Sequence, residues 1–98
     1  MIFGNEIKKL REERKLLQRN IATQLDIDTP LYSKFERGER LPKKTQISLI
    51  AQILETDERF LRVLWVADKL LKDIDEDHEI IKEAVNVVEK ELMNKIKT

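Results

Sequence analysis

The sequence predicts an all-α fold, a compact bundle of about five to six helices. Its 98 residues include only two Gly and two Pro, so few positions interrupt a helix. Charged residues make up 39% of the chain, well above the roughly 25% of an average domain, and apolar residues recur at helical spacing among them. A β-sandwich of this size would need more turn residues and more Val, Thr and Tyr.

Two short helices are expected first. The spacing of Ile7 and Leu10 predicts a helix from about Asn5, its N-cap, to Lys15. A second helix is expected from Gln18 to Leu25, with its apolar residues on one face.

A third helix is expected from Thr29 to about Arg37. Asp28 supplies an N-cap, and Pro30 is tolerated in the first turn because its missing N–H would have no intrahelical partner there. Gly38 ends the helix, since glycine readily adopts the left-handed backbone of a C′ residue.

The second half of the chain predicts three more helices. One runs from Lys44 to Leu54, and a longer one, capped by Asp57, runs to Leu71. The acidic stretch 73–79 separates it from a last helix at about 77–96, whose apolar stripe includes Ile81, Val88 and Leu92. All connections are short, which predicts one bundle with a two-helix C-terminal extension.

Several classes of protein are excluded by composition. Without cysteine there is no disulfide framework, thiolate metal site or Cys nucleophile. The longest apolar run, Val63–Ala67, is far too short for a membrane span, and no secretory signal is visible at the N-terminus. We therefore expect a cytoplasmic protein that does not interact with membranes.

Neither a metal site nor an active site is expected. Asp73, Asp75 and Asp77 resemble the start of a calcium loop, but His78 stands where that loop needs Gly and Ala84 where it needs Glu. With a single His and no Gly-rich phosphate loop, the sequence offers no catalytic triad or nucleotide site. We expect no cofactor, no bound metal and no enzymatic activity.

The zero net charge conceals an asymmetry between the two halves. Residues 1–44 hold 11 basic and 7 acidic side chains, whereas residues 45–98 hold 8 basic and 12 acidic ones. This division indicates that the N-terminal half meets a polyanion, although a mixed surface of a helical protein can also show it.

The stretch 18–37 carries the functional signal. Its two short helices meet across a tight connection, where Ala22 is small enough for close packing, and Tyr32 and Phe35 anchor the second helix from beneath. An exposed α-helix, with a diameter of roughly 10–12 Å including its side chains, fits the DNA major groove. The outward residues of that helix are Thr29, Pro30, Ser33, Lys34 and Arg37, and further basic residues that can neutralise phosphates are Arg19, Arg40, Lys43 and Lys44.

The chain resembles the helix-turn-helix domain of the lambdoid-repressor and Cro class (XRE-like), which also occurs in restriction–modification controller proteins. The resemblance spans about residues 5–61. Its motifs are IKKLR at 7–11, QRNIA at 18–22 and SKFERG at 33–38, followed by Pro42 and the apolar run 47–54. The segment LDIDTPLYSKFERGER at 25–40 is especially similar to the controller proteins.

The resemblance implies roles for individual residues. Thr29, Pro30, Ser33 and Lys34 would face base edges, with Lys34 donating to guanine. Phosphate contacts would come from Gln18, Arg37, Arg40 and Lys43, and Arg11 and Glu36 would form a structural ion pair between the first and third helices.

Three positions depart from the family pattern. Leu17 replaces the usual Ser or Thr cap, and Lys15 and Asp26 replace usual glycines. Asp tolerates a left-handed backbone better than most residues, so the turn can be kept.

These observations predict two segments and a function. Residues 1–61 would form the DNA-binding domain, and residues 62–98 a helical extension of the same compact unit that forms a homodimer through Phe60, Leu64, Trp65, Val88 and Leu92. The alternative for these apolar stripes is that they complete the monomer's own core. The leading hypothesis is a homodimeric, sequence-specific transcription regulator on a palindromic operator. The rival is an antitoxin-like module that masks a partner protein with its C-terminal helices.

Overall fold

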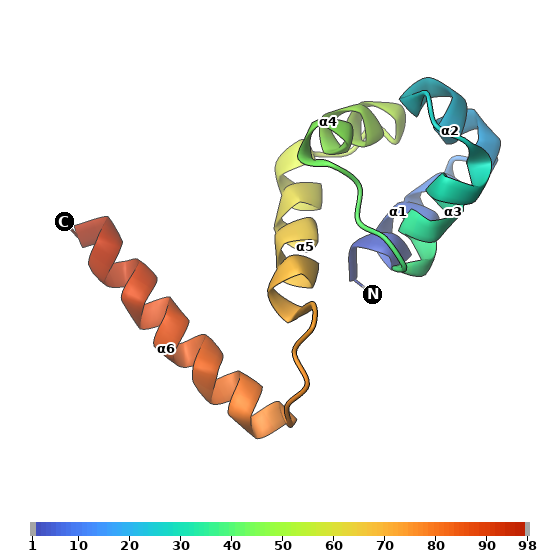
Figure 1. Cartoon of the computed structure of the whole chain (residues 1–98). Helices are drawn as coiled ribbons and strands as arrows, with labels where there is room; N and C mark the ends of the chain where they lie inside the picture. The colour runs from blue at the N-terminus through green and yellow to red at the C-terminus, as the bar shows by residue number, and fades with distance from the viewer. Residues whose placement is uncertain (1, 98) are drawn as a thin grey trace.

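The computed structural model describes residues 2–97 and is all-α in that range, which confirms the predicted fold class (Figure 1). No strand occurs among these residues. The six helices described are α1 (Ile2–Glu13), α2 (Gln18–Leu25), α3 (Thr29–Arg37), α4 (Lys44–Ile53), α5 (Glu58–Leu71) and α6 (His78–Lys97).

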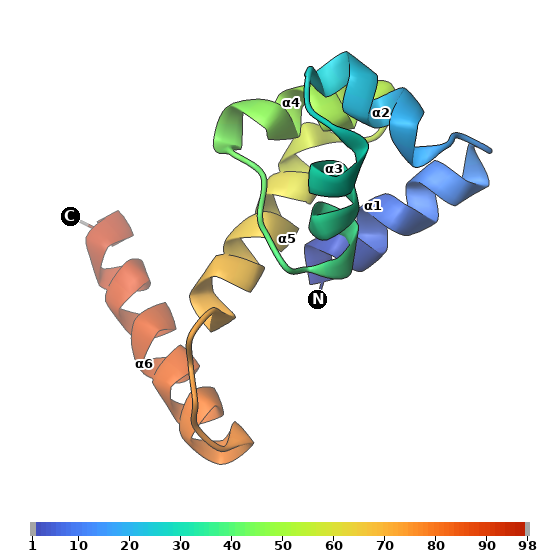
Figure 2. The ribbon, with the colours of Figure 1, turned by 45° about the vertical axis from the view of Figure 1, so that its right-hand side comes forward.

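Helices α1 to α5 enclose the hydrophobic core. α1 packs on α3 and α5, α2 on α3 and α4, and α4 on α5 (Figure 2). The core is built from the apolar side chains that the helical spacing places inward, and its largest fully buried members are Phe3, Ile7, Ile21, Tyr32, Ile47, Ile50, Leu54 and Leu61.

The ends of α2 and α3 follow from local sequence signals. The Asp28 carboxylate accepts the Leu31 N–H at 2.8 Å, and Gly38 ends α3 with a φ of 74°. Lys15 and Asp26, at the positions where the family has glycine, adopt left-handed backbones with φ of 57° and 58°. Leu17 has no capping side chain, but its N–H donates to Asn20 Oδ1 at 2.7 Å.

The first helix begins earlier than predicted, at Ile2 and not at Asn5. The reason is a cap supplied from α5: the buried Asp68 carboxylate accepts the N–H of Ile2 at 3.2 Å and that of Phe3 at 2.8 Å. Gly4 then lies directly against the end of α3. A Cβ on Gly4 would come within 2.5 Å of the carbonyl oxygens of Phe35 and Glu36.

The five-helix bundle extends beyond the boundary predicted between residues 61 and 62. That boundary falls inside α5, whose Trp65 and Asp68 are both buried. The Trp65 indole N–H donates to the Pro42 carbonyl at 2.9 Å, so this turn of α5 is bonded to the segment before α4.

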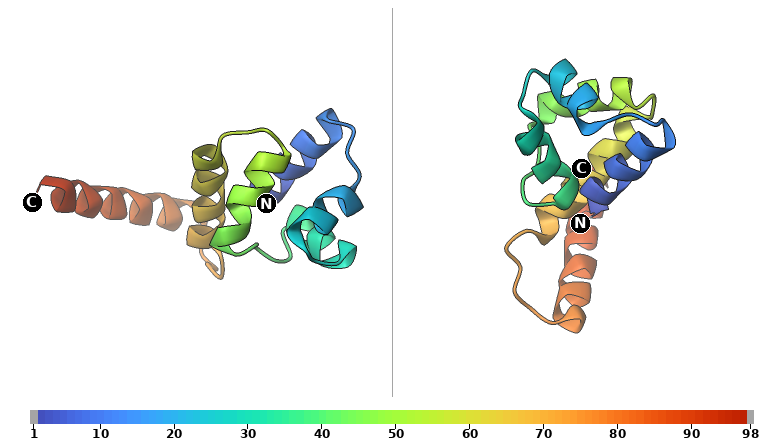
Figure 3. Two further views of the ribbon diagram at one scale, coloured as in Figure 1. Left: turned by 90° about the horizontal axis from the view of Figure 1, so that it is seen from above. Right: turned by 90° about the vertical axis from the view of Figure 1, so that its right-hand side faces the viewer.

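The last helix does not share this core, in contrast to the single compact unit that we predicted. α6 lies apart from the bundle, at the end of the connection 72–77, as Figure 1 and the left view of Figure 3 show. Every residue from Lys82 to Ile96 is exposed. The radius of gyration is 15.6 Å, compared with about 13 Å for a compact chain of this length. The inner face of α5 already closes the core, so the apolar stripe of α6 finds no site there.

Candidate nucleic-acid interface

Helix α3 presents its polar side to solvent. Figure 2 shows it in front of α1 and α5, with α2 beside it. Pro30 and Lys34 are exposed, and Thr29 and Ser33 are half-buried. The four residues predicted to face base edges therefore all reach the surface of α3.

The other side of α3 is fixed in the core. Tyr32 and Phe35 are buried, and their rings meet edge to face with centroids 6.1 Å apart. Ala22 is 1% exposed where α2 packs on α3, and Ile27 is half-buried in the connection. Because these contacts hold the helix from beneath, α3 projects as a rigid unit.

A buried carboxylate ties α3 to α1 and α2. Glu36 is 4% exposed and accepts bonds from Arg11 Nε at 2.7 Å and Arg11 Nη2 at 3.1 Å. The Gln18 amide donates to the same carboxylate at 2.9 Å, and Arg11 also donates to the Leu16 carbonyl at 2.9 Å. The ion pair implied by the resemblance is therefore present.

This network sets the charge of Glu36. Burial by itself would raise the pKa of Glu36, but the hydrogen bonds from Arg11 and Gln18 outweigh burial and lower the pKa below its ordinary value. Burial, together with the charge of Glu36, raises the pKa of the Tyr32 phenol far above its ordinary value. The inner side of α3 thus holds an ionised carboxylate beside a neutral phenol.

The predicted phosphate contacts divide into two groups. Arg19, Arg40 and Lys43 have exposed side chains, whereas Gln18 is half-buried and directed to Glu36. The Gln18 side chain is thus part of the internal network in addition to lying at the start of α2.

Arg37 has two partners on the surface. It donates to Ser33 Oγ at 2.5 Å and forms an ion pair with Glu39. The hydrogen bond from Arg37 lowers the pKa of Glu39. A phosphate placed here would compete with Glu39 for the Arg37 guanidinium.

A surface hollow of about 440 Å³ lies between α1, α2 and α3. Its lining residues are Asn5, Lys8, Gln18, Ser33, Glu36 and Arg37. Sequence reasoning missed Asn5 and Lys8 as neighbours of the interface. The sequence does hold a signal for Lys8. It precedes Arg11 by three residues, about one helical turn, and Arg11 was expected to face the third helix.

The predicted dimer residues lie in different environments. Phe60 is exposed on α5, and Val88 and Leu92 are exposed on α6, whereas Leu64 is half-buried against the core. Trp65 is buried inside the bundle, where Lys69 Nζ lies 4.0 Å from its ring centroid. Its place in the core corrects our assignment of Trp65 to a dimer interface.

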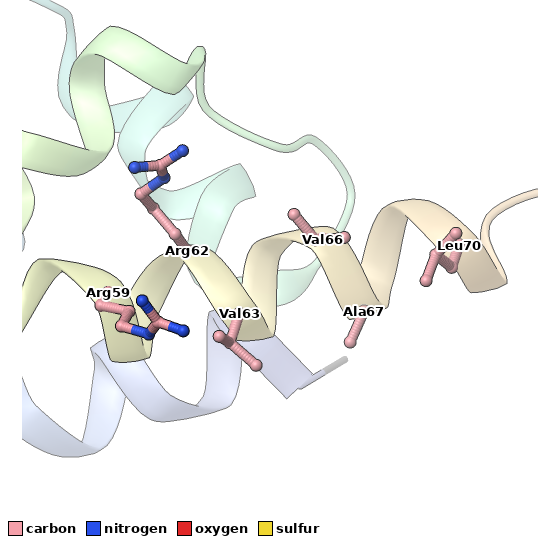
Figure 4. Close-up of a pocket in the computed structure, with 6 residues that line it drawn as sticks. All are labelled: Arg59, Arg62, Val63, Val66, Ala67 and Leu70. Atoms are coloured by element: carbon pink, nitrogen blue, oxygen red, sulfur yellow. The ribbon is translucent and has the colours of Figure 1, made fainter. Parts of the chain in front are cut away.

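A further exposed apolar surface runs along α5. Figure 4 shows a shallow pocket of about 510 Å³ along this helix. It is lined by Arg59, Arg62, Val63, Val66, Ala67 and Leu70.

Residues 2–97 show no grouping of three or more side chains of the types that bind metals. Over the same residues, no helix combines the length and apolar character needed to cross a bilayer.

Comparison with known proteins matches residues 7–61 to the helix-turn-helix family. An uncharacterized HTH-type transcriptional regulator of Bacillus subtilis, YqaE, is 32% identical over 72 residues, which cover 74% of this chain and 62% of that protein. The control protein C.MunI of a Mycoplasma species is 49% identical over 39 residues, 39% of this chain and 53% of that protein. The matches thus span about half to three fifths of these relatives, and no solved structure matches significantly.

The matched region includes α2, α3 and the buried Glu36 network, so the family pattern and the geometry coincide. No enzymatic domain is indicated by these matches. The chain belongs to the helix-turn-helix family of XRE type, a family of DNA-binding transcriptional regulators.

Proposed function

We propose that this protein is a homodimeric, sequence-specific regulator that inserts α3 into the major groove of a palindromic operator. The observation that carries the proposal is the division of α3 into two sides. Lys34 and Pro30 are exposed, while Tyr32, Phe35 and Glu36 fix the helix in the bundle.

Base reading is assigned to Thr29, Pro30, Ser33 and Lys34. Lys34 has the chemistry to donate to guanine O6 and N7, and the Pro30 ring can contact a thymine methyl. Arg19, Arg37, Arg40 and Lys43 would neutralise phosphates on either side of the groove, and Gln18 would place the start of α2 against another phosphate.

A dimer would supply selectivity that a single α3 lacks. A two-fold pair reads two half-sites about 34–36 Å apart, or a multiple of that distance, and gains affinity from bivalency. The exposed apolar residues of α5 and α6, including Phe60, Val88 and Leu92, support an interface there.

The similarity to a control protein supports a role as a restriction–modification controller. Such a regulator acts by occupancy: it blocks polymerase when bound over a promoter and recruits polymerase when bound just upstream. No catalytic step is required, and double-stranded DNA is the ligand.

Selection of bound sequences from a random DNA pool tests this function. We expect one palindromic sequence to be enriched, with affinity that falls as salt rises because phosphate contacts release counterions. Affinity that depends on salt but shows no preferred sequence would reject sequence-specific regulation.

A second candidate is an antitoxin-like module whose C-terminal helices mask a partner protein. The exposure of α6 from Lys82 to Ile96 favours it. Purification with an obligate heterologous partner, together with failure to select an operator, would identify this function.

A further inference from the structure

Helix α5 is apolar on two sides. Leu61 and Trp65 face the core, while Val63 and Leu70, 57% and 65% exposed, lie on the opposite side with Val66 and Ala67 (Figure 4). An apolar outer face on a helix that already packs inward indicates a second packing partner.

The apolar surface continues onto α6. A groove of about 230 Å³ lies between the end of α5 and the start of α6. Its lining is almost wholly apolar, with Leu70, Leu71, Ile74, Ile80, Ile81, Ala84, Val85, Val88 and one acidic residue, Glu76. Beyond the groove, Leu92 and Ile96 extend the stripe along α6.

An isolated helix such as α6 requires a partner. Helices in proteins gain most of their stability from tertiary packing of an apolar face, and α6 is exposed at every residue from Lys82 to Ile96. The stripe through Ile81, Val85, Val88 and Leu92 has the spacing of three and four that suits a helix bundle.

Charge indicates which partner and which orientation. Arg59 and Arg62 lie at the N-terminal end of the outer face of α5, and the acidic residues Asp75 and Glu76 follow its C-terminal end. Within residues 2–97 none of these four forms an ion pair. An antiparallel pair of α5 helices would bring each basic end beside the acidic segment of the other copy, whereas a parallel pair would place like charges together.

We propose that a second copy of this chain covers this surface, so that α5 and α6 of two subunits form an antiparallel four-helix bundle. Arg59 and Arg62 of each subunit face Asp75 and Glu76 of the other. The two contacts are equivalent by two-fold symmetry, so one surface serves both subunits. The proposal rests on the dimeric function above and specifies its interface, but it needs no DNA to be tested.

The experiment exploits this charge arrangement in the full chain. One variant carries R59E and R62E, and another carries D75K and E76K; analytical ultracentrifugation measures their self-association. We expect each variant alone to lose the dimer, with Kd raised at least about 100-fold, because both contacts of the homodimer become repulsive. An equimolar mixture should recover a heterodimer, because both of its contacts are then attractive.

A pair of apolar variants checks α6 independently. V88E lies on the stripe and should give monomers, whereas V87E, on another side of α6, should remain dimeric. Urea denaturation monitored by circular dichroism confirms that each variant keeps the cooperative unfolding of the α1–α5 bundle, so loss of the dimer is separated from unfolding of the core.

Three measurements of self-association would overturn the proposal. They are a wild-type chain that is monomeric at micromolar concentration, a dimer that persists in R59E with R62E or in V88E, and an equimolar mixture that stays monomeric. Capture of a different protein on α6 in place of the second copy would also overturn it. Failure of the regulatory function is recognised separately, as a dimer with the predicted charge dependence that selects no DNA sequence.

Discussion

The Asp68 carboxylate accepts the backbone N–H of Phe3 at 2.8 Å, and the two residues are 65 positions apart. This bond joins the C-terminal part of α5 to the first turn of α1. The first turn of α1 also lies against the end of α3, at Gly4. The helix proposed to form the dimer is therefore connected to the helix proposed to read DNA through one turn of α1.

Replacing Asp68 should destabilise the bundle. D68A would leave the N–H groups of Ile2 and Phe3 without their acceptor, and we expect a loss of about 2 kcal/mol in the free energy of unfolding. D68N keeps an oxygen acceptor and should cost less, while E13A, at an exposed position of α1, should stay within about 0.5 kcal/mol. Urea denaturation monitored by circular dichroism measures all three, and equal stability of D68A and E13A would contradict the capping role.

The contact at Gly4 predicts an unusual sign for a helical glycine. Glycine to alanine inside a helix ordinarily stabilises by up to about 1 kcal/mol. G4A should instead destabilise by roughly 1–3 kcal/mol, because its Cβ would collide with carbonyl oxygens of α3 that cannot move freely. Thermal unfolding tests this, with K9A as an exposed control on α1. A stabilised G4A would show that the two helices can separate without cost.

Stability should depend on pH through Glu36. Its pKa is lowered in the folded state, so the ionised carboxylate stabilises the fold above the unfolded pKa of about 4.3, and this contribution is lost as pH falls below that value. E36Q should cost about 3–5 kcal/mol at pH 7 because Arg11 is left without its counter-charge. In urea titrations, the difference in free energy of unfolding between wild type and E36Q should narrow as the pH is lowered from 5 to the folded-state pKa of Glu36. A difference that stays constant with pH would contradict this role.

Lys34 and Arg40 should affect DNA binding differently. K34A removes a base contact and should cost about 1–3 kcal/mol on the selected operator, with relaxed preference at one base pair. R40A removes a phosphate contact, so it should weaken binding to all sequences alike and reduce the salt slope by about 1. Fluorescence anisotropy over a salt series distinguishes the two effects, with K90A on α6 as control. The assignment of Lys34 to base reading fails if K34A weakens binding to all DNA sequences equally.

Releasing Arg37 should strengthen DNA binding. E39Q removes the carboxylate that pairs with Arg37 and also removes a negative charge near the proposed phosphate path. We expect a modest rise in affinity at low salt that fades as salt increases. R37A with E39Q should lose this gain, and an E39Q protein that binds no better than wild type would show that the pair does not compete with DNA.

The sequence predicted the elements whose signals are local. Asp28, Pro30 and Gly38 are all within or beside α3, and they define both of its ends. The inward position of Tyr32 and Phe35 likewise followed from their spacing of three.

Tertiary contacts account for what was missed. The start of α1 depends on Asp68, which no local pattern connects to Ile2. Trp65 was assigned to an interface because its apolar neighbours form a stripe, but the Pro42 carbonyl accepts its indole N–H inside the bundle. The partner of Gln18 could not be predicted either, because Glu36 was already assigned to Arg11.

The two sides of α3 are chemically independent, because Tyr32, Phe35 and Glu36 make their bonds and contacts without help from Pro30 or Lys34. The exposed positions can therefore be exchanged for those of another regulator while the scaffold is retained. Such an exchange would redirect the protein to a new operator at little cost in folding stability. The bundle can therefore serve as a scaffold for different DNA-reading residues.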